Sequence, residues 1–253
     1  MGRLSGKAAV VTGAAGGLGL AMAQAFSREG ATVALLDNNA DGVRQAAASL
    51  GGKAGEGEGL AYVCDISDRA AVKRAIDAFA AHAGGLDILV NNAVYFSYSP
   101  LADMAEDVID RMVDIGLKGV FWSLQAATPH LIARGGGSVI NLSSIAVSFS
   151  IRHAAVYSSL KGAIDALTRQ QAVELGAHGI RVNALAPGPV ATPGASSVIT
   201  QDGWEARRQR TPLGRLASAD EVAAAAVFLV SDDALSIAGV TLKIDAGITV
   251  AGP

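Results

Sequence analysis

The 253-residue chain is predicted to form an α/β domain in which helices cover both faces of a seven-stranded parallel sheet. Short apolar runs rich in β-branched residues alternate with stretches of helical periodicity from one end of the sequence to the other. Apolar residues make up 51% of the chain and charged residues 17%, a balance that supports a large core and argues against disorder. No repeat or linker interrupts the pattern, so we expect residues 1–253 to form one domain.

Seven runs have the character of buried strands. They are Lys7–Thr12, Ala31–Leu36, Leu60–Cys64, Leu86–Val90, Ser138–Leu142, Ile180–Ala184 and Thr241–Ile244. Helical periodicity predicts helices at about residues 17–29, 39–50, 68–82, 101–133, 155–177 and 219–231. Asp68 and Ser218 are predicted N-caps, and Gly30, Gly84 and Gly179 mark expected helix ends.

The composition excludes several classes of protein. Twenty basic and 23 acidic residues give a net charge of −3, without the basic excess of a nucleic-acid binder. Cys64 is the single cysteine, so a disulfide framework and a cysteine-rich zinc site are excluded, and we expect no metal. No secretion leader opens the sequence and no apolar run approaches the length of a membrane span. We therefore expect a soluble, cytoplasmic protein.

A glycine-rich turn, Thr12–Gly19 (TGAAGGLG), follows the first predicted strand. Glycines at positions 13, 17 and 19, with Leu18 between the last two, let the backbone approach a pyrophosphate at a helix N-terminus. The alternative is a plain strand-to-helix turn that needs unusual backbone angles, since 30 glycines form clusters by chance. The place of the turn after the first strand favours dinucleotide binding. No Gly-Lys-Ser/Thr follows, which excludes a nucleoside-triphosphatase loop.

Two acidic residues follow the next strands at positions that fit an adenosine. Asp37, after the second strand, would accept hydrogen bonds from a ribose and repel a 2′-phosphate. No Lys or Arg lies within residues 14–18 or 38–43 to pair such a phosphate, so NAD is predicted and NADP is disfavoured. The alternative for Asp37 is a cap on the following helix. Asp65, after the third strand, either bonds the adenine amino group or stabilises a turn.

Tyr157 and Lys161 lie four positions apart on a predicted helix, and therefore on one face of it. A phenol with a pKa near 10 is a poor base at neutral pH, and lowering that pKa to about 7 needs about 4 kcal/mol. The Lys161 ammonium and the positive ring of an oxidised nicotinamide would act in that direction. Ser144, at the end of the fifth strand, would hold a substrate oxygen beside the phenol. The alternative for the pair is surface packing.

In this order the motifs resemble those of the short-chain dehydrogenase/reductase family, from Gly6 to Gly247. The matching segments are TGAAGGLG (12–19), Asp37, CDI (64–66), NNA (91–93), LKGVF (117–121), INLSS (140–144), YSSLK (157–161), GIRVNALAPGPVAT (179–192) and IDAG (244–247). The resemblance implies a Rossmann fold with strand order 3-2-1-4-5-6-7 and an enzyme that interconverts alcohols and carbonyl compounds. It also implies a homotetramer, with a homodimer as the alternative.

The resemblance assigns roles to individual residues. It makes Tyr157 the general acid/base, Ser144 the group that positions the substrate oxygen, and Lys161 the residue that holds the nicotinamide ribose and lowers the Tyr157 pKa. The implied cofactor-binding residues are Gly13, Gly17, Leu18, Gly19, Asp37, Asp65, Ile66, Asn91, Ala93, Tyr157, Lys161, Pro187, Gly188, Val190 and Thr192.

Three positions depart from the family pattern. Val94 and Ala246 stand where the family has glycine, in its NNAG and VDGG motifs. Gly116 stands where the family has a catalytic asparagine that helps hold a water of the proton relay. Three interpretations stay open for Gly116: a relay completed by an extra water, a deliberately introduced change, or a weakened enzyme. Asp114 is about 200° away on a helix, so it is not expected to substitute unless the helix is broken there.

Apolar residues near the predicted site indicate the substrate. Aromatic residues cluster after the fourth strand, and others fall between Ser144 and Tyr157 or in residues 188–217, an irregular segment that is a candidate lid. The candidate substrate residues are Val94, Tyr95, Phe149, Ile151 and Trp204. We predict an NAD-dependent oxidoreductase for a bulky apolar alcohol or ketone, aromatic or alicyclic. The alternatives are that these side chains pack a lid or a subunit interface, and that the protein binds NAD without turnover.

Overall fold

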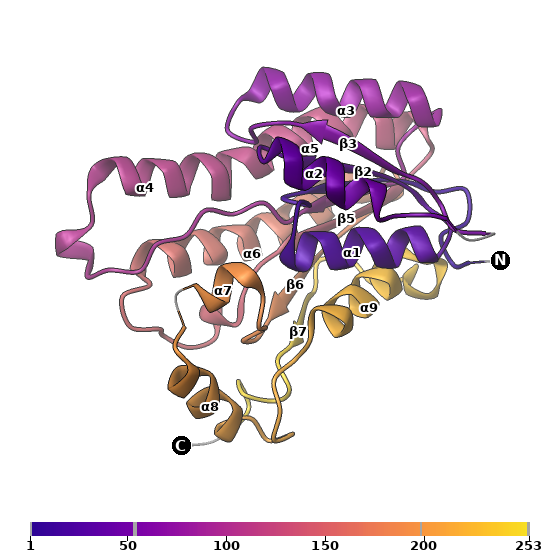
Figure 1. Cartoon of the computed structure of the whole chain (residues 1–253). Helices are drawn as coiled ribbons and strands as arrows, with labels where there is room; N and C mark the ends of the chain where they lie inside the picture. The colour runs from indigo at the N-terminus through magenta and orange to yellow at the C-terminus, as the bar shows by residue number, and fades with distance from the viewer. Residues whose placement is uncertain (1, 53–54, 198, 252–253) are drawn as a thin grey trace.

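Seven parallel strands form one sheet in the order β3-β2-β1-β4-β5-β6-β7 (Figure 1), as the sequence predicted. The computed structural model describes residues 2–52, 55–197 and 199–251; residues 1, 53–54, 198 and 252–253, which fall within the predicted domain and lid, lie outside the described residues. The strands are β1 (Ala8–Thr12), β2 (Thr32–Asp37), β3 (Gly59–Val63), β4 (Ile88–Asn91), β5 (Gly137–Leu142), β6 (Ile180–Pro187) and β7 (Thr241–Ile244). Their carboxyl ends meet at one edge of the sheet, where ligands bind in folds of this kind.

Helices cover both faces of the sheet (Figure 1). One face is packed by α1 (Gly17–Arg28), α2 (Ala40–Ala48) and α9 (Ala219–Val230). The other is packed by α3 (Arg69–Ala83), α5 (Gly119–Ala133) and α6 (Ala155–Gly176). Among the described residues, no helix combines the length and the apolar character that crossing a bilayer requires.

Alternate residues of each inner strand supply the two halves of the core. In β1, Ala9 and Val11 pack with the α1 and α9 side, whereas Ala8 and Val10 pack with the α3 and α5 side. All five residues of β1 are buried, because both faces of a parallel sheet are covered by helices. This explains why the predicted strands contain continuous apolar runs.

The predicted helix caps are confirmed. The Asp68 carboxylate accepts from the backbone N–H groups of Ala70 and Ala71 at the start of α3, and Gly84 ends that helix with a φ of 72°. Ser218 begins α9 in a reciprocal capping box with Glu221.

Two regions differ from the predicted elements. The helix expected over residues 101–133 is divided into α4 (Glu106–Val113), a π-helical segment η2 (Asp114–Lys118) and α5, and a separate 3₁₀ turn η1 (Leu101–Asp103) precedes them. The segment 188–217, expected to be irregular, contains α7 (Pro193–Ser196) and α8 (Gln201–Gln209). Thr192 and Thr200 cap these helices with side-chain oxygens, a local signal that was missed because both helices are short. Two further 3₁₀ turns are η3 (Ile145–Val147) and η4 (Asp232–Ala234).

Candidate active site

The glycine-rich turn connects β1 to α1 and is held by backbone contacts. Gly13 and Gly17 have φ angles of 64° and 57°, in the left-handed region that favours glycine. A Cβ on Gly19 would lie 2.3 Å from the carbonyl oxygen of Gly13, so the turn requires a residue without a side chain there. The Asn92 amide donates to the carbonyl oxygens of Thr12 and Gly13 at 2.9 and 3.0 Å. Asn92, the residue after strand β4, thus fixes the turn.

Asp37 ends β2 beside this turn. Its Oδ2 accepts from the N–H of Ala15 at 3.0 Å, and its Oδ1 accepts from the N–H of Asn39 at 2.9 Å. These bonds tie the carboxylate to the glycine-rich turn, while Asn39, and not Asp37, caps α2. The alternative prediction that Asp37 caps the following helix is therefore wrong.

A cavity of about 230 Å³ lies over the ends of β2 and β3. Of the predicted site residues it is lined by Gly13, Asp37, Asp65, Ile66, Ala93, Val94 and Tyr95. Asp65 also accepts from the backbone and side chain of Ser67, so it stabilises its own turn. The Arg111 guanidinium stacks 4.1 Å from the centre of the Tyr95 ring. Tyr95, predicted to contact the substrate, therefore lines this cavity and does not line the larger cavity that contains Tyr157.

A second cavity, of about 590 Å³, runs from the glycine-rich turn to Tyr157. We call it the catalytic cavity. Of the predicted cofactor and catalytic residues it is lined by Gly13, Gly17, Leu18, Asp37, Ala93, Ser144, Tyr157, Lys161, Pro187, Gly188, Val190 and Thr192. Of the predicted substrate residues, Val94, Ile151 and Trp204 line it.

Four predicted or highlighted residues lie outside the lining of both cavities. Phe149 is half-buried, and its position between Ser144 and Tyr157 in the sequence does not bring it into the catalytic cavity. Gly19 is covered by the turn that it helps to form. Asn91 is buried and donates to the Asn141 side chain at 2.8 Å, joining β4 to β5. Gly116 is buried within η2.

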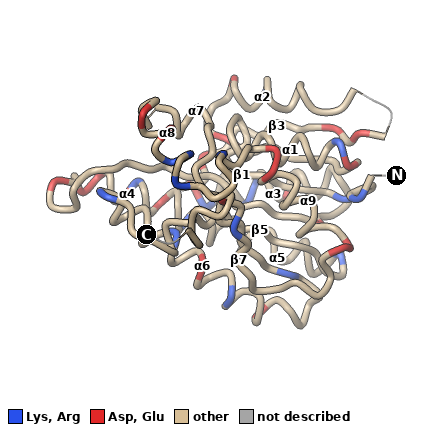
Figure 2. The backbone as a smooth tube through the Cα atoms, turned by 90° about the horizontal axis from the view of Figure 1, so that it is seen from below, with Lys and Arg blue, Asp and Glu red and all other residues tan. Residues whose placement is uncertain are grey.

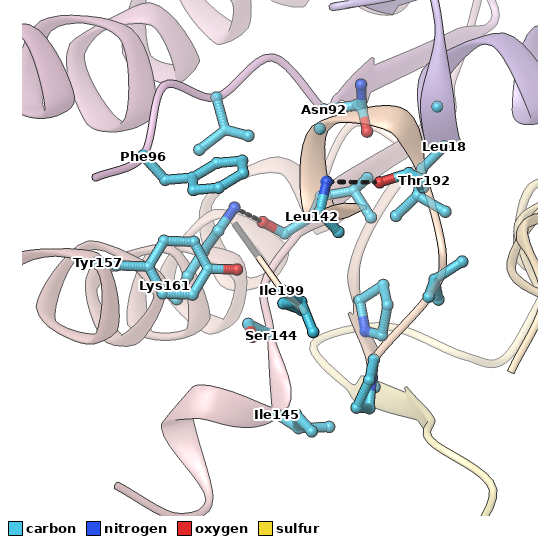
Figure 3. Close-up of a pocket in the computed structure, with 18 of the residues that line it drawn as sticks. Leu18, Asn92, Phe96, Leu142, Ser144, Ile145, Tyr157, Lys161, Thr192 and Ile199 are labelled. Atoms are coloured by element: carbon cyan, nitrogen blue, oxygen red, sulfur yellow. Dashed lines mark hydrogen bonds between the residues drawn. The ribbon is translucent and has the colours of Figure 1, made fainter. Parts of the chain in front are cut away.

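Tyr157, Lys161 and Ser144 come together in the catalytic cavity (Figure 3). Tyr157 and Lys161 lie one turn apart on α6, and the ammonium nitrogen is 5.8 Å from the centre of the phenol ring. Lys161 is 7% exposed and donates to the Leu142 carbonyl oxygen at 2.6 Å, which ties α6 to the end of β5. Ser144 follows β5 and caps the short turn η3.

Burial dominates the protonation of this group. It raises the pKa of the Tyr157 phenol, and a hydrogen bond with the Ser144 side chain opposes that increase. It lowers the pKa of Lys161 to about 8, because an ammonium is disfavoured away from water. The lowered phenol pKa predicted from the sequence is thus absent from the protein alone. The remaining source named in that prediction is the positive charge of an oxidised nicotinamide.

The π-helical segment η2 surrounds the position where the family asparagine was expected. A Cβ added to Gly116 would meet Leu160 at 3.5 Å, which is ordinary van der Waals contact. Asp114 is half-exposed and forms an ion pair with Lys118 at 2.8 Å. The α-helix is interrupted at Asp114, the condition under which substitution was left open, but Asp114 is paired with Lys118 and lines neither cavity.

The part of the catalytic cavity lined by Phe96, Tyr98, Ile151, Ile199 and Trp204, which we call the substrate end, has an aromatic wall. Phe96 and Tyr98, from the loop after β4, lie with ring centres 6.2 and 5.7 Å from that of Tyr157. Ile199 and Trp204, from the α7–α8 region, add apolar surface. The aromatic cluster after the fourth strand contained the signal for Phe96 and Tyr98, although they were not among the candidate substrate residues.

Two arginines of this end, Arg152 and Arg207, were missed entirely. Neither stands in a recognisable motif, and surface arginines are common in any sequence. Only the folding of the loop before α6 and of α8 brings them to the cavity. No sequence signal could have identified them.

The residues present fit a bound dinucleotide. A Cβ on Gly16, which lines the catalytic cavity, would meet no protein atom within 4 Å, so open space faces the backbone at the N-terminus of α1. Across the cavity, Thr192 lies 3.7 Å from where a Cβ on Gly17 would be. Asp37 and Lys161 both line this cavity and would be the residues that contact the two riboses of such a dinucleotide. Within the described part of the chain, no group of three or more His, Cys, Asp or Glu side chains is placed to hold a metal ion.

Comparison with known proteins agrees with this geometry. Residues 13–249 match the family model described as enoyl-(acyl carrier protein) reductase. D-threitol dehydrogenase from Mycolicibacterium smegmatis is 39% identical over 98% of this chain and 95% of its own. A short-chain type dehydrogenase/reductase from Mycobacterium marinum is 31% identical with a TM-score of 0.91, over 97% of this chain and 96% of the other. A 7α-hydroxysteroid dehydrogenase, in complex with NADH and 7-oxo glycochenodeoxycholic acid, is 33% identical with a TM-score of 0.92, over 97% and 95%.

Proposed function

Because the chain belongs to the short-chain dehydrogenase/reductase family and is an oxidoreductase of alcohols and ketones, we propose that it uses NAD and acts on a bulky apolar secondary alcohol or ketone. The observation that carries the proposal is the single cavity that joins the glycine-rich turn and Asp37 to Ser144, Tyr157 and Lys161. A dinucleotide laid along it would bring its reactive end to the only part of the lining that carries the predicted proton-transfer residues.

The protein's part in the reaction is proton transfer and positioning. Bound NAD supplies the hydride acceptor, or NADH the donor. Ser144 holds the substrate oxygen, and the Tyr157 hydroxyl donates a proton to it in reduction or accepts one in oxidation. Lys161, which is fixed by the Leu142 carbonyl, binds the nicotinamide ribose. The positive charge of an oxidised nicotinamide favours the phenolate form of Tyr157.

The preference for NAD rests on Asp37. Asp37 lies at the part of the catalytic cavity beside the glycine-rich turn, which we call the dinucleotide end. Two backbone N–H groups hold its carboxylate there, so it cannot move aside without breaking those hydrogen bonds. A 2′-phosphate there would meet a fixed negative charge, and no Lys or Arg lies in the adjacent segments named above to compensate. We expect kcat/KM with NAD to exceed that with NADP by roughly a hundredfold, or about 3 kcal/mol.

The preference for an apolar substrate rests on the wall that Phe96, Tyr98, Ile151, Ile199 and Trp204 form around the reacting group. Apolar surface of this kind binds a ring better than a hydroxylated chain, because polar groups lose their hydration there without gaining partners. A polyol is the competing substrate class, because the similar protein from M. smegmatis is a D-threitol dehydrogenase.

A matrix of cofactors and substrates tests the proposal. NAD and NADP are each combined with cyclohexanol, 1-phenylethanol and D-threitol, and NADH and NADPH with the matching ketones, while reduced-cofactor absorbance is followed. We expect turnover with NAD and the ring alcohols. Turnover with D-threitol alone would replace the apolar substrate class by polyols, and turnover with NADP alone would overturn the role given to Asp37.

A protein that binds NAD without turnover is the rival hypothesis, with Gly116 as its support. Ser144, Tyr157 and Lys161 are all present and brought together, which argues against it. NADH binding, measured by the fluorescence of the reduced cofactor, with no turnover of any alcohol or ketone in the matrix would favour this rival.

Two further expectations belong to this proposal. The segment 188–217 would act as a lid, because its α7–α8 region lines the cavity and neither α7 nor α8 packs closely against a strand of the sheet. The chain would form a homotetramer, since Val173 on α6 and Leu242 on the sheet-edge strand β7 leave apolar surface exposed. Light scattering of the purified protein tests the assembly, and a monomer would contradict it.

A further inference from the structure

The substrate end of the catalytic cavity carries an unbalanced positive charge. Arg152 and Arg207 line the cavity in addition to Lys161. Among the described lining residues, the only acidic side chain is Asp37, which belongs to the dinucleotide end. The whole chain has a net charge of −3, so this local excess does not follow from its composition.

Tyr98 and its loop connect the two arginines to Tyr157. Its ring lies 5.7 Å from that of Tyr157. The charge of Arg207 acts on the Tyr98 hydroxyl and lowers its pKa, against burial that raises the pKa to about 12. The backbone N–H of Ser99 donates to the carbonyl oxygen of His153 at 3.1 Å, so the Arg152–His153 turn is fixed beside the same loop. Arg207 therefore lies near Tyr98, and the turn that carries Arg152 is held beside the loop that carries Tyr98.

Arg207 is positioned and has no carboxylate partner among the described residues. Its Nη1 donates to the Gly203 carbonyl oxygen at 2.8 Å, and it lies so close to the helix that a Cβ on Gly203 would be 3.2 Å from it. Glu205, the nearest acid on α8 in sequence, is engaged by Arg208 and Gln209 instead. Figure 2 shows α8 with acidic positions in its first half and basic positions in its second.

We propose that the substrate carries an oxyanion, in the simplest case a carboxylate, on its apolar body, and that Arg207 and Arg152 bind it. The inference rests on the proposed function, because it specifies the substrate class of the same cavity. A guanidinium with unused donors binds a planar oxyanion through two parallel hydrogen bonds. Arg207 and Arg152 line the same cavity as the aromatic wall, so one ligand can place its oxyanion at the arginines and its apolar body against the wall.

A pair of ketones of equal shape tests the inference. The enzyme is assayed with NADH and either 4-acetylbenzoate or its neutral isostere 4-acetylbenzamide. We expect kcat/KM for the benzoate to be higher by roughly tenfold or more, the effect of one charge-assisted hydrogen bond, mostly through KM. High salt should reduce the ratio, because the arginines remain accessible to solvent ions. Equal kcat/KM values for the two ketones would overturn the proposal.

Matched variants on α8 identify the residue responsible. Arg207→Gln should bring the ratio close to one, and an unchanged Tm and NADH affinity should show that the variant is folded. Arg208→Gln removes a neighbouring charge of the same helix that is paired to Glu205 and does not line the cavity, so it should retain the ratio. Arg152→Gln should give a partial loss. An unchanged ratio in both Arg207→Gln and Arg152→Gln would overturn the assignment.

Binding without turnover separates this inference from the proposed function. Benzoate and benzamide are titrated into the protein with saturating NADH by calorimetry. Preferential binding of benzoate that disappears in Arg207→Gln would support the anion site even if neither ketone is reduced, an outcome that would contradict only the proposed reaction. No preference for benzoate at millimolar concentration would overturn the anion site whatever the turnover.

Discussion

The dinucleotide end and the substrate end of the catalytic cavity are built in different ways. The dinucleotide end is made by short continuous segments at the ends of β1 and β2, and backbone atoms provide most of its hydrogen bonds. The substrate end is made by side chains from the loop after β4, the turn before α6 and the α7–α8 region. Local sequence determines the first end, whereas the packing of distant segments determines the second.

Backbone strain follows the same division. In the dinucleotide end, the positive φ angles fall on glycines, Gly13 and Gly17. Among the described residues, the non-glycine residues with positive φ are His153, at 63°, and Ala246, at 53°. His153 lines the substrate end, and the Ala246 carbonyl oxygen accepts from Leu213 after α8. One of the two strained residues thus lies at the substrate end of the cavity, and such strain is common at functional sites.

The largest expected effect comes from Tyr157, where the two ends meet. Tyr157→Phe removes the hydroxyl that exchanges a proton with the substrate and keeps the ring against Phe96 and Tyr98. We expect kcat to fall by roughly 10³-fold while the Kd for NADH changes little. Steady-state turnover and NADH fluorescence titration provide the two measurements. Retained turnover would place the proton-transfer group elsewhere, and loss of NADH binding would show that the two ends are not separable.

The glycine-rich turn allows the backbone contribution of the dinucleotide end to be tested. A Cβ on Gly19 would lie 2.3 Å from the Gly13 carbonyl oxygen and 2.6 Å from the Asn92 amide. Gly19→Ala should therefore destabilise the protein by about 3 kcal/mol, more than the roughly 1 kcal/mol that Ala gains over Gly in a helix. Thermal unfolding measures the change.

Gly16→Ala is the matched control in the same turn. Its Cβ would meet no protein atom within 4 Å, but Gly16 lines the catalytic cavity. We expect unchanged stability and roughly tenfold weaker NADH binding, about 1.4 kcal/mol. If Gly19→Ala unfolds no more easily than Gly16→Ala, the close backbone contacts do not hold this end together.

How far the sequence could predict the molecule follows from the same division. The seven strands were predicted from short apolar patterns and their order from the family resemblance, and the fold agrees with both predictions. The helix over 101–133 was wrong because helical periodicity does not reveal the extra residue of the π-helical segment around Gly116. Phe149 and Tyr95 were misplaced because sequence proximity does not give the direction of a side chain in a loop. Arg207 depends on the fold of a segment expected to be irregular.

A substitution of Lys161 tests whether this buried catalytic side chain lowers the stability of the fold. Burial lowers its folded-state pKa to about 8, below the value near 10.4 of an unfolded chain. Between these two values the unfolded state binds more protons than the folded state, so wild-type stability should rise as pH increases from about 8 to about 10.4. Lys161→Met removes the buried charge and should be more stable at pH 7, by roughly 2 kcal/mol after loss of the Leu142 hydrogen bond, while losing turnover.

Urea denaturation of wild type and Lys161→Met across this pH range provides the measurement. The advantage of the variant should decrease as pH approaches about 10.4. A constant difference between the two proteins would show that burial of the ammonium does not destabilise the fold.

A smaller effect on stability is expected at Ala246, which has a positive φ of 53°. Ala246→Gly should stabilise the protein by roughly 0.5–1 kcal/mol, because the left-handed cost for Ala exceeds the added chain entropy of Gly. Differential scanning calorimetry should show an increase in Tm of roughly 2 °C. The reciprocal variant is Gly247→Ala, at a φ of 89° with Pro212 3.1 Å from the new Cβ, and it should lower Tm. A lower Tm for Ala246→Gly would show that the turn is not strained.

A substitution at Gly116 is expected to give the smallest change in stability. It tests separately what the fold and what the proton transfer require at this position. The π-helical segment forms here without the asparagine of the family, so its geometry comes from the packing of α4, α5 and α6 around it. A new Cβ would make only ordinary contact with Leu160, at 3.5 Å. Gly116→Asn should therefore fold with an unchanged Tm, within the roughly 0.5 kcal/mol typical of unstrained substitutions.

The kinetic outcome for Gly116→Asn distinguishes the interpretations of this position. If a water now completes the proton relay, the restored carboxamide replaces or holds that water, and kcat should be equal to or above that of wild type. A clear increase in kcat would identify the present enzyme as weakened. A large loss of turnover with unchanged Tm and NADH affinity would contradict a relay of the family type, because it would mean that this site depends on the space that the glycine leaves beside α6.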